Sequence, residues 1–320
     1  EKKGFGGFWK KLSGSRELSL VAVLVLLCAV IQLRNNTFLT AKTIADLLKN
    51  YSTTITISLG MMSVLLIGGI DISVGATLAF SGMCSSLMMR DGVYSSTLVM
   101  FLVSIAIGTL CGMLVGLIIA KGGVQPIIAT LGTQQIYRGF AYLVSNGKNI
   151  LISNDFLTFI GRGDILGVPV VVLLMIVMFA ITAYVLKYTS FGRKIYAIGG
   201  NKNASYLSGI NIRRVQMGGF VYCSVAGALG GILLASQVGV ALPTCGIGSD
   251  MDVIASVVLG GVSLSGGCGK VSGTLLGALI LQTISNGMTL LSVQSYWQMV
   301  IKGIVLILAV LIDVMRSKKR

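Results

Sequence analysis

Ten long apolar segments follow one another along this 320-residue chain, with few charges inside them. They cover residues 18–33, 51–68, 74–89, 97–120, 125–144, 168–187, 213–235, 251–265, 271–291 and 296–312. Only 11% of the residues are charged, whereas soluble proteins carry roughly 25%. A soluble core cannot hide so much apolar surface, but a lipid bilayer solvates it. The sequence therefore predicts an all-α fold, a polytopic transmembrane helical bundle of about 10 helices.

Two polar, glycine-containing interruptions divide this bundle. They lie near 69–75 and 246–252, and each precedes a segment that is short for a straight span of ~20 residues. We therefore expect broken or re-entrant helices at both places. Segments 2–5 and segments 7–10 begin on opposite sides of the membrane, which predicts an inverted repeat within a single transmembrane domain, residues 1–320.

Positive charge is distributed unevenly between the two sides. With the N-terminus inside, seventeen Lys and Arg residues fall on the cytoplasmic side and six on the other side. Cytoplasmic loops carry this excess in membrane proteins, so it accounts for the net charge of +15 without nucleic-acid binding. No small-residue cleavage site follows the first segment, which favours an uncleaved helix over a signal peptide. The sequence predicts a multi-pass protein whose N- and C-termini are both cytoplasmic.

Residue types that carry metal and nucleophilic chemistry are scarce. The chain has no histidine, and its six cysteines form no CxxC pair. This argues against a zinc site and against a Ser-His-Asp triad. We expect the cysteines to pack as small apolar residues, and we expect no cofactor.

The first polar motif is Ile67–Gly75, which places Asp71 and Ser73 among apolar residues. A charged side chain at the centre of a membrane helix costs about 2.5–3.5 kcal/mol on insertion scales. Asp71 and Ser73 either cap the helix that follows the glycines or line a polar path through the membrane, and both roles can hold together. The sequence leaves both open.

The second motif is Gly122–Gly132, in which Pro126 suits the first position of a helix. A tight cytoplasmic turn is the interpretation that we favour. Gln125 and Thr130 are nevertheless candidates to face a polar cavity.

Four further polar residues lie within or near apolar segments. Asn286 and Lys302 are candidates for buried contacts inside the bundle. Arg138 and Asp313 are expected to extend to the membrane interface, as long or terminal polar side chains do.

The third motif is the long cytoplasmic stretch from Ser190 to Arg214. Asn201 is a favourable N-cap and Gly209 a favourable C-terminal stop, so a helix of about two turns is expected between them. Ala204 and Leu207 share one face of that helix. A structured loop with small and apolar residues favours docking to a partner over a plain connector.

The fourth motif begins with Asp250 and Asp252 at the outer start of the eighth segment. Carboxylates are favourable at a helix N-terminus, and they can also meet a basic partner or a polar substrate. The glycines that follow, between residues 260 and 269, lack the Gly-Lys-Ser/Thr ending of a nucleotide-binding loop.

In combination these motifs resemble the permease subunits of bacterial ATP-binding-cassette (ABC) importers for monosaccharides, of the ribose/xylose/galactose type. The match runs from Phe38 to Asp313. It is carried by Gly69–Gly75, Val124-Gln125, Ile128–Gly132, Phe191–Arg193, Ala197–Asn201, Ser208–Ile210, and Asp252 with Val258–Gly261. Two departures, Asp250 in place of a common glutamate and Ser205 in place of a usual alanine, leave the substrate open.

The resemblance implies a mechanism. Two permeases would form the pathway in the bacterial inner membrane, an extracytoplasmic sugar-binding protein would deliver the substrate and contact Asp250, and separate ATPase subunits would drive the conformational change. The ATPase would dock on the coupling loop 188–212, through Gly199, Gly200, Asn201, Ala204, Ser208, Gly209 and Ile210. The path would be lined by Asp71, Ser73, Gln125, Thr130, Asp252 and Asn286.

Two other classes of protein remain as alternatives. An ion-coupled secondary transporter of a small polar solute also uses inverted repeats and broken helices, but it needs no docking helix for an ATPase. An intramembrane enzyme lacks support, because the sequence offers no nucleophile and base. Which sugar is carried, and whether the second permease is identical, stay open.

Overall fold

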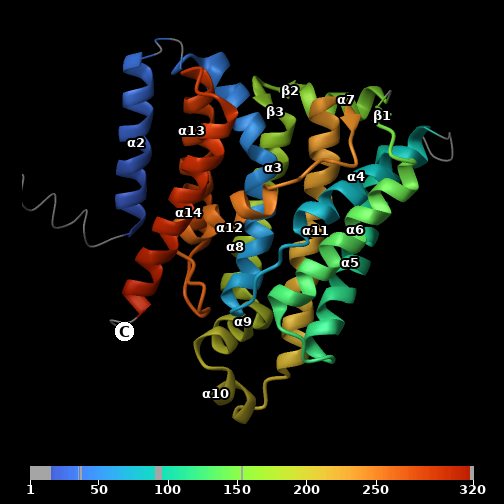
Figure 1. Cartoon of the computed structure of the whole chain (residues 1–320), viewed down its shortest axis with the longest axis vertical. Helices are drawn as coiled ribbons and strands as arrows, with labels where there is room; N and C mark the ends of the chain where they lie inside the picture. The colour runs from blue at the N-terminus through green and yellow to red at the C-terminus, as the bar shows by residue number, and fades with distance from the viewer. Residues whose placement is uncertain (1–15, 35, 37, 91–95, 153, 318–320) are drawn as a thin grey trace, which may run out of the picture.

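The computed structural model is a bundle of helices (Figure 1). It describes residues 16–34, 36, 38–90, 96–152 and 154–317. Five of the described helices are long and apolar enough to cross a membrane: Glu17–Arg34, Thr97–Ala120, Val170–Tyr188, Ile212–Val238 and Ser295–Met315. This confirms the prediction of an all-α, polytopic membrane protein.

Each of the ten predicted segments corresponds to a helix. These helices are α2 (Arg16–Arg34), α3 (Ala41–Leu66), α4 (Val74–Arg90), α5 (Thr97–Ala120), α6 (Pro126–Ser145), α8 (Val170–Tyr188), α11 (Ile212–Val238), α12 (Ser249–Leu259), α13 (Val271–Leu290) and α14 (Ser295–Ser317). The largest difference is at α3, which begins ten residues before the predicted segment. Its polar first turns start at Thr40, whose side chain accepts a hydrogen bond from the Thr43 N–H.

Shorter elements connect these helices. They are α7 (Asp155–Arg162), α9 (Ser190–Gly200), α10 (Lys202–Leu207), β1 (Ile150–Leu151), β2 (Asp164–Ile165), β3 (Val168–Pro169) and β4 (Val240–Ala241). Strand β1 pairs antiparallel with β4, with Ile150 opposite Ala241, and β2 pairs antiparallel with β3. The strands lie at the end of the bundle opposite α10 (Figure 1).

The predicted breaks are present. Between α3 and α4 the chain leaves the helical path from Ile67 to Ser73. Helix α12 has 11 residues and therefore rises about 16 Å, roughly half of the ~30 Å hydrocarbon thickness. Non-helical segments, residues 239–248 and 260–270, flank it on both sides.

The packing of the helices follows the predicted repeat of α3–α6 and α11–α14. Helix α3 packs on α12 and α13, just as α11 packs on α4 and α5. The two leading helices, α3 and α11, also contact each other and run in opposite directions (Figure 1). Each half therefore inserts its first helix against the second and third helices of the other half, the pattern expected of an inverted repeat.

A stripe of small residues brings α5 and α11 into close contact. Ser104, Gly108, Gly112 and Gly116 are spaced four apart on α5, so they share one face. A Cβ on Gly108 would meet Val225 Cα at 2.8 Å. The Ser104 hydroxyl donates to the carbonyl of Ala228 on α11 at 2.8 Å. Small residues and interhelical hydrogen bonds are how membrane helices associate without a hydrophobic driving force between them.

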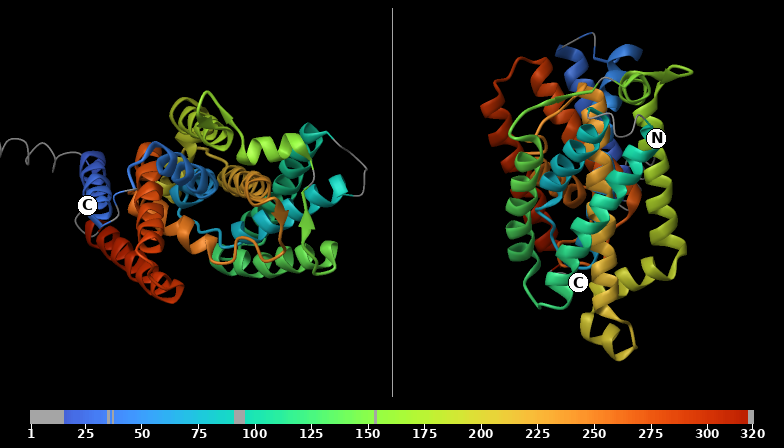
Figure 2. Two further views of the ribbon diagram at one scale, coloured as in Figure 1. Left: turned by 90° about the horizontal axis from the view of Figure 1, so that it is seen from above. Right: turned by 90° about the vertical axis from the view of Figure 1, so that its right-hand side faces the viewer.

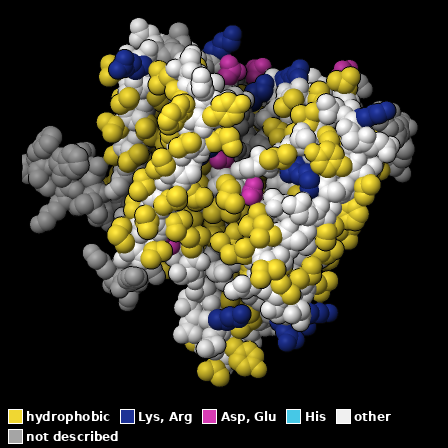
Figure 3. All heavy atoms as spheres, in the orientation of Figure 1, with side chains coloured by type: hydrophobic (Ala, Val, Ile, Leu, Met, Phe, Trp, Pro, Cys, Tyr) yellow, Lys and Arg dark blue, Asp and Glu magenta, His cyan; other side chains and the backbone are white. Residues whose placement is uncertain are grey.

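Helix α11 is more deeply buried than the helices at the edge of the bundle. In α11, 61% of the apolar window is buried, against 11% in both α2 and α14. Seen from above, α2 and α14 form one edge of the bundle and α6 lies on the other side of it (Figure 2). Apolar side chains cover most of the face in Figure 3, while basic side chains gather toward its two ends. This is the surface expected of a chain solvated by lipid between two aqueous layers.

Candidate functional site

The break between α3 and α4 is organised by Asp71. Its Oδ1 accepts hydrogen bonds from the Ser73 N–H at 2.9 Å and from the Ser73 hydroxyl at 2.6 Å. Both side chains are fully buried, and Oδ2 of Asp71 has no hydrogen-bond partner among the described residues. The contacts are those of the capping role, because they satisfy a backbone N–H just before α4. A role in lining a path stays a prediction.

Of the other predicted path residues, Thr130 lies at the same break. Its hydroxyl on α6 is 3.3 Å from the carbonyl oxygen of Ile70. Gln125 is exposed at the start of α6, and its side chain makes no capping hydrogen bond. Asn286 is half-buried on α13, where its neighbour Gly287 packs on α2. The structure thus brings Thr130 to Asp71 and Ser73, but not Gln125 or Asn286.

Asp252 forms an ion pair that connects α12 to α14. Lys302 Nζ lies 2.6 Å from Asp252 Oδ2, and the two side chains are 29% and 23% exposed. This confirms that Lys302 makes a contact inside the bundle. Asp250, two residues earlier, is only 5% exposed. Its burial does not favour the predicted contact with a binding protein, which no observation tests.

Arg138 and Asp313 bind protein groups instead of reaching away from the bundle, so the interpretation of both as snorkelling side chains is wrong. The Arg138 guanidinium donates to the carbonyls of Pro243 and Cys245 at 2.7 and 2.6 Å, and to that of Gly75 at 3.2 Å. Asp313 is 6% exposed, and its Oδ2 accepts from the hydroxyl of Ser263 and the N–H of Leu264. The physical reason is that non-helical backbone inside a membrane needs partners, and these side chains supply them.

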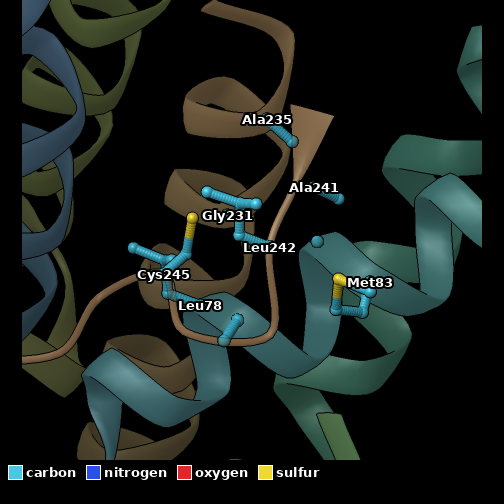
Figure 4. A pocket seen from close by; sticks show the side chains of 9 residues that line it. Leu78, Met83, Gly231, Ala235, Ala241, Leu242 and Cys245 are labelled. Carbon is cyan, nitrogen blue, oxygen red and sulfur yellow. The ribbon is translucent and has the colours of Figure 1, made fainter. Parts of the chain in front are cut away.

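A small apolar pocket lies between α4, α11 and the non-helical segment before α12 (Figure 4). Its walls include Leu78 and Met83 from α4, Gly231 from α11, and Leu242 and Cys245 from the segment. Few groups in this lining can form hydrogen bonds, so the pocket is unsuited to a sugar. The pocket is a small space between α4, α11 and residues 241–245.

The predicted short helix at the other end of the bundle is present as α10. The Asn201 side chain accepts from the Ala204 N–H at 2.9 Å. Gly209 has φ +77°, and the N–H of Ile210 returns to the carbonyl of Ser205 at 3.1 Å. These are the expected N-cap and glycine stop, and both are confirmed. Ser208 also closes the last turn, because its hydroxyl donates to the Ala204 carbonyl.

Two apolar side chains of α10 are unusually open. Tyr206 is 72% exposed and Leu207 is 85% exposed, while Ser205 faces the protein and is buried. Sequence reasoning named Leu207 but not Tyr206. Exposed large apolar side chains on a helix that lies outside the spans indicate a surface for another protein.

Helix α9, which the sequence did not predict, connects α10 to the core. Gly199 lies so close to Leu66, the last residue of α3, and to Gly267 that a Cβ would overlap both backbones. The Gly267 N–H donates to the Leu66 carbonyl at 2.9 Å. The Tyr196 hydroxyl donates to the carbonyl of Gly269 at 2.9 Å, and burial raises the pKa of Tyr196, which keeps this donor protonated. Gly200, by contrast, faces open space, because an added Cβ would meet no atom within 4 Å.

Within the described residues, no group of three His, Cys, Asp or Glu side chains is placed to hold a metal ion. The geometry therefore offers a docking helix outside the spans, a rigid junction behind it, and charged groups at the membrane breaks.

Comparison with known proteins connects these features to a family. A family model described as the permease component of the branched-chain amino acid transport system matches residues 43–310. The ribose import permease protein of Haemophilus influenzae is 41% identical over 297 residues, which cover 91% of this chain and 90% of that protein. The L-arabinose ABC transporter permease protein of Azospirillum brasilense is 35% identical, with 98% and 91% covered. The D-allose transport system permease protein of Escherichia coli is 34% identical, with 99% and 96% covered. No solved structure matches the chain.

The family match spans both halves of the repeat, the coupling loop and every break described above. It confirms the resemblance that the motifs indicated, and it disfavours an intramembrane enzyme. The chain belongs to this family of importer permease components, and it is a transport subunit rather than an enzyme.

Proposed function

We propose that the chain is the permease subunit of an ABC importer that carries a monosaccharide into the cell. The observation that carries this proposal is the similarity, over nine tenths of the chain, to permeases named for ribose, L-arabinose and D-allose. All three sugars are aldoses, and the highest of these identities is to a ribose permease, so a pentose such as ribose is the proposed substrate.

The transport path is proposed to run along the face formed by α6, α12 and α14. Arg138 on α6, Asp252 on α12 and Lys302 on α14 supply polar groups to these helices, while apolar side chains cover much of the view in Figure 3. A charge facing lipid is costly, so charged groups in membrane helices normally face water or protein. A second permease, identical or different, would cover this face and enclose the path. Asp71, Ser73 and Thr130 lie behind it, at the break before α4.

The ATPase is proposed to dock on α10. Tyr206 and Leu207 offer apolar contacts for a groove on the partner, and the caps at Asn201 and Gly209 keep the helix formed. Closure of the ATPase would press on α9, whose Gly199 contacts the end of α3. Movement of α9 would thereby shift the loop 263–269 and the non-helical residues around Asp71, which its neighbours Gly267 and Leu66 adjoin. Under this proposal α10 and both termini face the cytoplasm, and the binding protein meets the opposite end.

An ion-coupled secondary transporter is the rival function. It has no use for two exposed apolar side chains on a capped helix outside the bundle, nor for a stiff junction behind them. The features around α10 therefore favour an importer driven by a separate ATPase.

The substrate is tested by uptake into proteoliposomes that contain the chain with its ATPase and binding protein. The panel is D-ribose, L-arabinose and D-allose, each with ATP inside or outside the vesicle. We expect ATP-dependent uptake, highest for a pentose. Uptake driven by a proton or sodium gradient without ATP would overturn the proposal, as would failure to carry any aldose.

The docking role is tested by ATPase binding to Leu207→Asp, with Leu166→Asp as the matched control for that binding. Both leucines are very exposed, at 85% and 100%, but Leu166 lies at the opposite end, in the turn between β2 and β3. We expect Leu207→Asp to weaken ATPase binding about tenfold or more, because interface anchors commonly cost more than 1 kcal/mol when lost, whereas Leu166→Asp should leave ATPase binding unchanged. Normal ATPase assembly and uptake with Leu207→Asp would contradict the docking role.

A further inference from the structure

The segment between β4 and α12 has the structure of a hinged strap. We call residues 242–248 the strap. Its beginning is anchored, because β4 pairs with β1 through Ala241 opposite Ile150. Glycines with positive φ interrupt and end it, at Gly246 (+72°) and Gly248 (+79°). Glycine adopts such conformations without strain, so the backbone can turn at these points.

The inner side of the strap borders a small apolar pocket. Leu242 and Cys245 border the apolar pocket, across from Leu78 of α4 and Gly231 of α11 (Figure 4). Side chains that border a void lack van der Waals partners on that side. Cys245 also packs against the hydrophobic core on its other sides, so its thiol becomes accessible only if the strap moves.

Arg138 holds the strap from the other side. One guanidinium nitrogen donates to both Pro243 and Cys245, and the other donates to Gly75 at the start of α4. Bonds from a charged donor are roughly twice as strong as neutral ones. A single side chain of α6 thus joins the strap to α4, where the backbones of Gly75 and Gly246 are already in contact. Among the described residues, Arg138 has no ion-pair partner.

The strap leads directly into α12. Three residues separate Gly248, the N-cap of α12, from Asp252, which is paired with Lys302 of α14. Movement of the strap would therefore displace the first turn of α12, where the proposed path carries its charges.

We propose that Arg138 is a positioning residue that latches the strap, and that the strap swings away from Arg138 when the end of the path opposite α10 opens. The gating role rests on the proposed function. The latch itself is a property of the chain alone, so it can fail or succeed without any transport assay.

The first experiment measures the rate at which N-ethylmaleimide alkylates Cys245 in the full chain in lipid vesicles, resolved by peptide mass spectrometry. The variants are Arg138→Gln and Arg138→Lys. The matched control is Arg162→Gln, because Arg162 also donates to two carbonyls, those of Gln237 and Val238, which lie before the β4 pairing that anchors the strap. Cys111, buried in α5, reports on loosening of the whole bundle.

We expect alkylation of Cys245 to rise about tenfold or more in Arg138→Gln, because three charge-assisted bonds are lost. Arg138→Lys should give a smaller rise, since an ammonium cannot reproduce the planar fork of donors. Arg162→Gln and the rate at Cys111 should not change. An unchanged rate at Cys245 in both Arg138 variants would overturn the latch. A parallel rise in the alkylation rate of Cys111 would also overturn the latch. If Arg138→Gln does not fold, the alkylation rate of Cys245 in Arg138→Lys decides the test.

The second experiment addresses gating in the complete importer with the unaltered chain. Cys245 alkylation is compared without nucleotide and with a non-hydrolysable ATP analogue plus the loaded binding protein. We expect at least a threefold difference between the two states. Equal alkylation rates in the two states would overturn the gating role. Unequal rates in an importer that carries none of the sugars tested would count against the proposed substrate and would support the movement of the strap.

Discussion

The contact between α5 and α11 has no room for an added side chain. At Gly112 a Cβ would lie 2.9 Å from the Phe220 carbonyl oxygen and from the Val221 nitrogen, and nearer still to the Val221 Cα. These are backbone atoms, which cannot rotate aside as the end of a flexible side chain can. Gly112→Ala therefore forces the two helices apart.

The size of the effect follows from two opposing contributions. Overpacking a tight contact costs typically 1–3 kcal/mol. Alanine in place of glycine within a helix returns about 1 kcal/mol. We therefore expect Gly112→Ala to be destabilising by up to about 2 kcal/mol, and Gly112→Leu by more, because its branched side chain cannot fit between the helices.

The matched control is Gly132→Ala on α6. Gly132 is also helical, but a Cβ there meets no atom within 4 Å. This change should be neutral or stabilising by up to about 1 kcal/mol. The assay is thermal unfolding of the purified chain in one detergent, with the order Gly132→Ala, unaltered chain, Gly112→Ala and Gly112→Leu from most to least stable. If Gly112→Ala unfolds no lower than Gly132→Ala, the close packing of α5 on α11 is refuted.

Three further predictions concern charged and capping residues. Asp252→Asn and Lys302→Met should each reduce uptake and lower the free energy of unfolding, because each single change leaves a partly buried charge without its partner. The double variant should lose about 1 kcal/mol less of that free energy than the sum of the two single losses. Strictly additive losses would refute the ion pair. Asn201→Ala removes a helix cap worth about 1 kcal/mol, so a titration of ATPase binding should show severalfold weaker affinity, and unaltered affinity would contradict this. Asp71→Asn should keep at least half of the uptake rate, because an amide oxygen still accepts both bonds from Ser73, whereas a tenfold loss would mean that the charge itself is used.

The helices could be predicted from the sequence because their signal is local. The length and hydrophobicity of each apolar segment suffice to predict a helix in lipid, so all ten were predicted without information about their neighbours. Helix α9 escaped prediction because it is short and only a few positions, such as Ile195 and Ile198, are buried. The glycines at 108, 112 and 116 are spaced four apart and could have indicated that another helix packs closely on α5.

The same distinction applies to the candidate site. The caps of α10 at Asn201 and Gly209 were predictable, since each acts on backbone groups within a few residues of itself. The contact of Lys302 was expected, but its partner was not, because Asp252 lies 50 residues away. Sequence patterns of short range carry no information about which helices meet, so partners across the bundle had to come from the structure.

The errors at Arg138 and Asp313 have one physical origin. Each was treated as a charge that must escape from lipid, whereas each is held inside by non-helical backbone that needs it: carbonyls of the strap for Arg138, and an N–H of the loop after α12 for Asp313. Asp71 does the same for the break before α4. An ionisable side chain thus bonds to the backbone at each of the three described breaks. Arg138, which is half-buried, donates to freed carbonyls, and the buried Asp71 and Asp313 accept from freed N–H groups. Once a membrane chain has broken helices, an isolated charge in an apolar segment is better interpreted as the missing partner of a break than as a residue on its way to the interface.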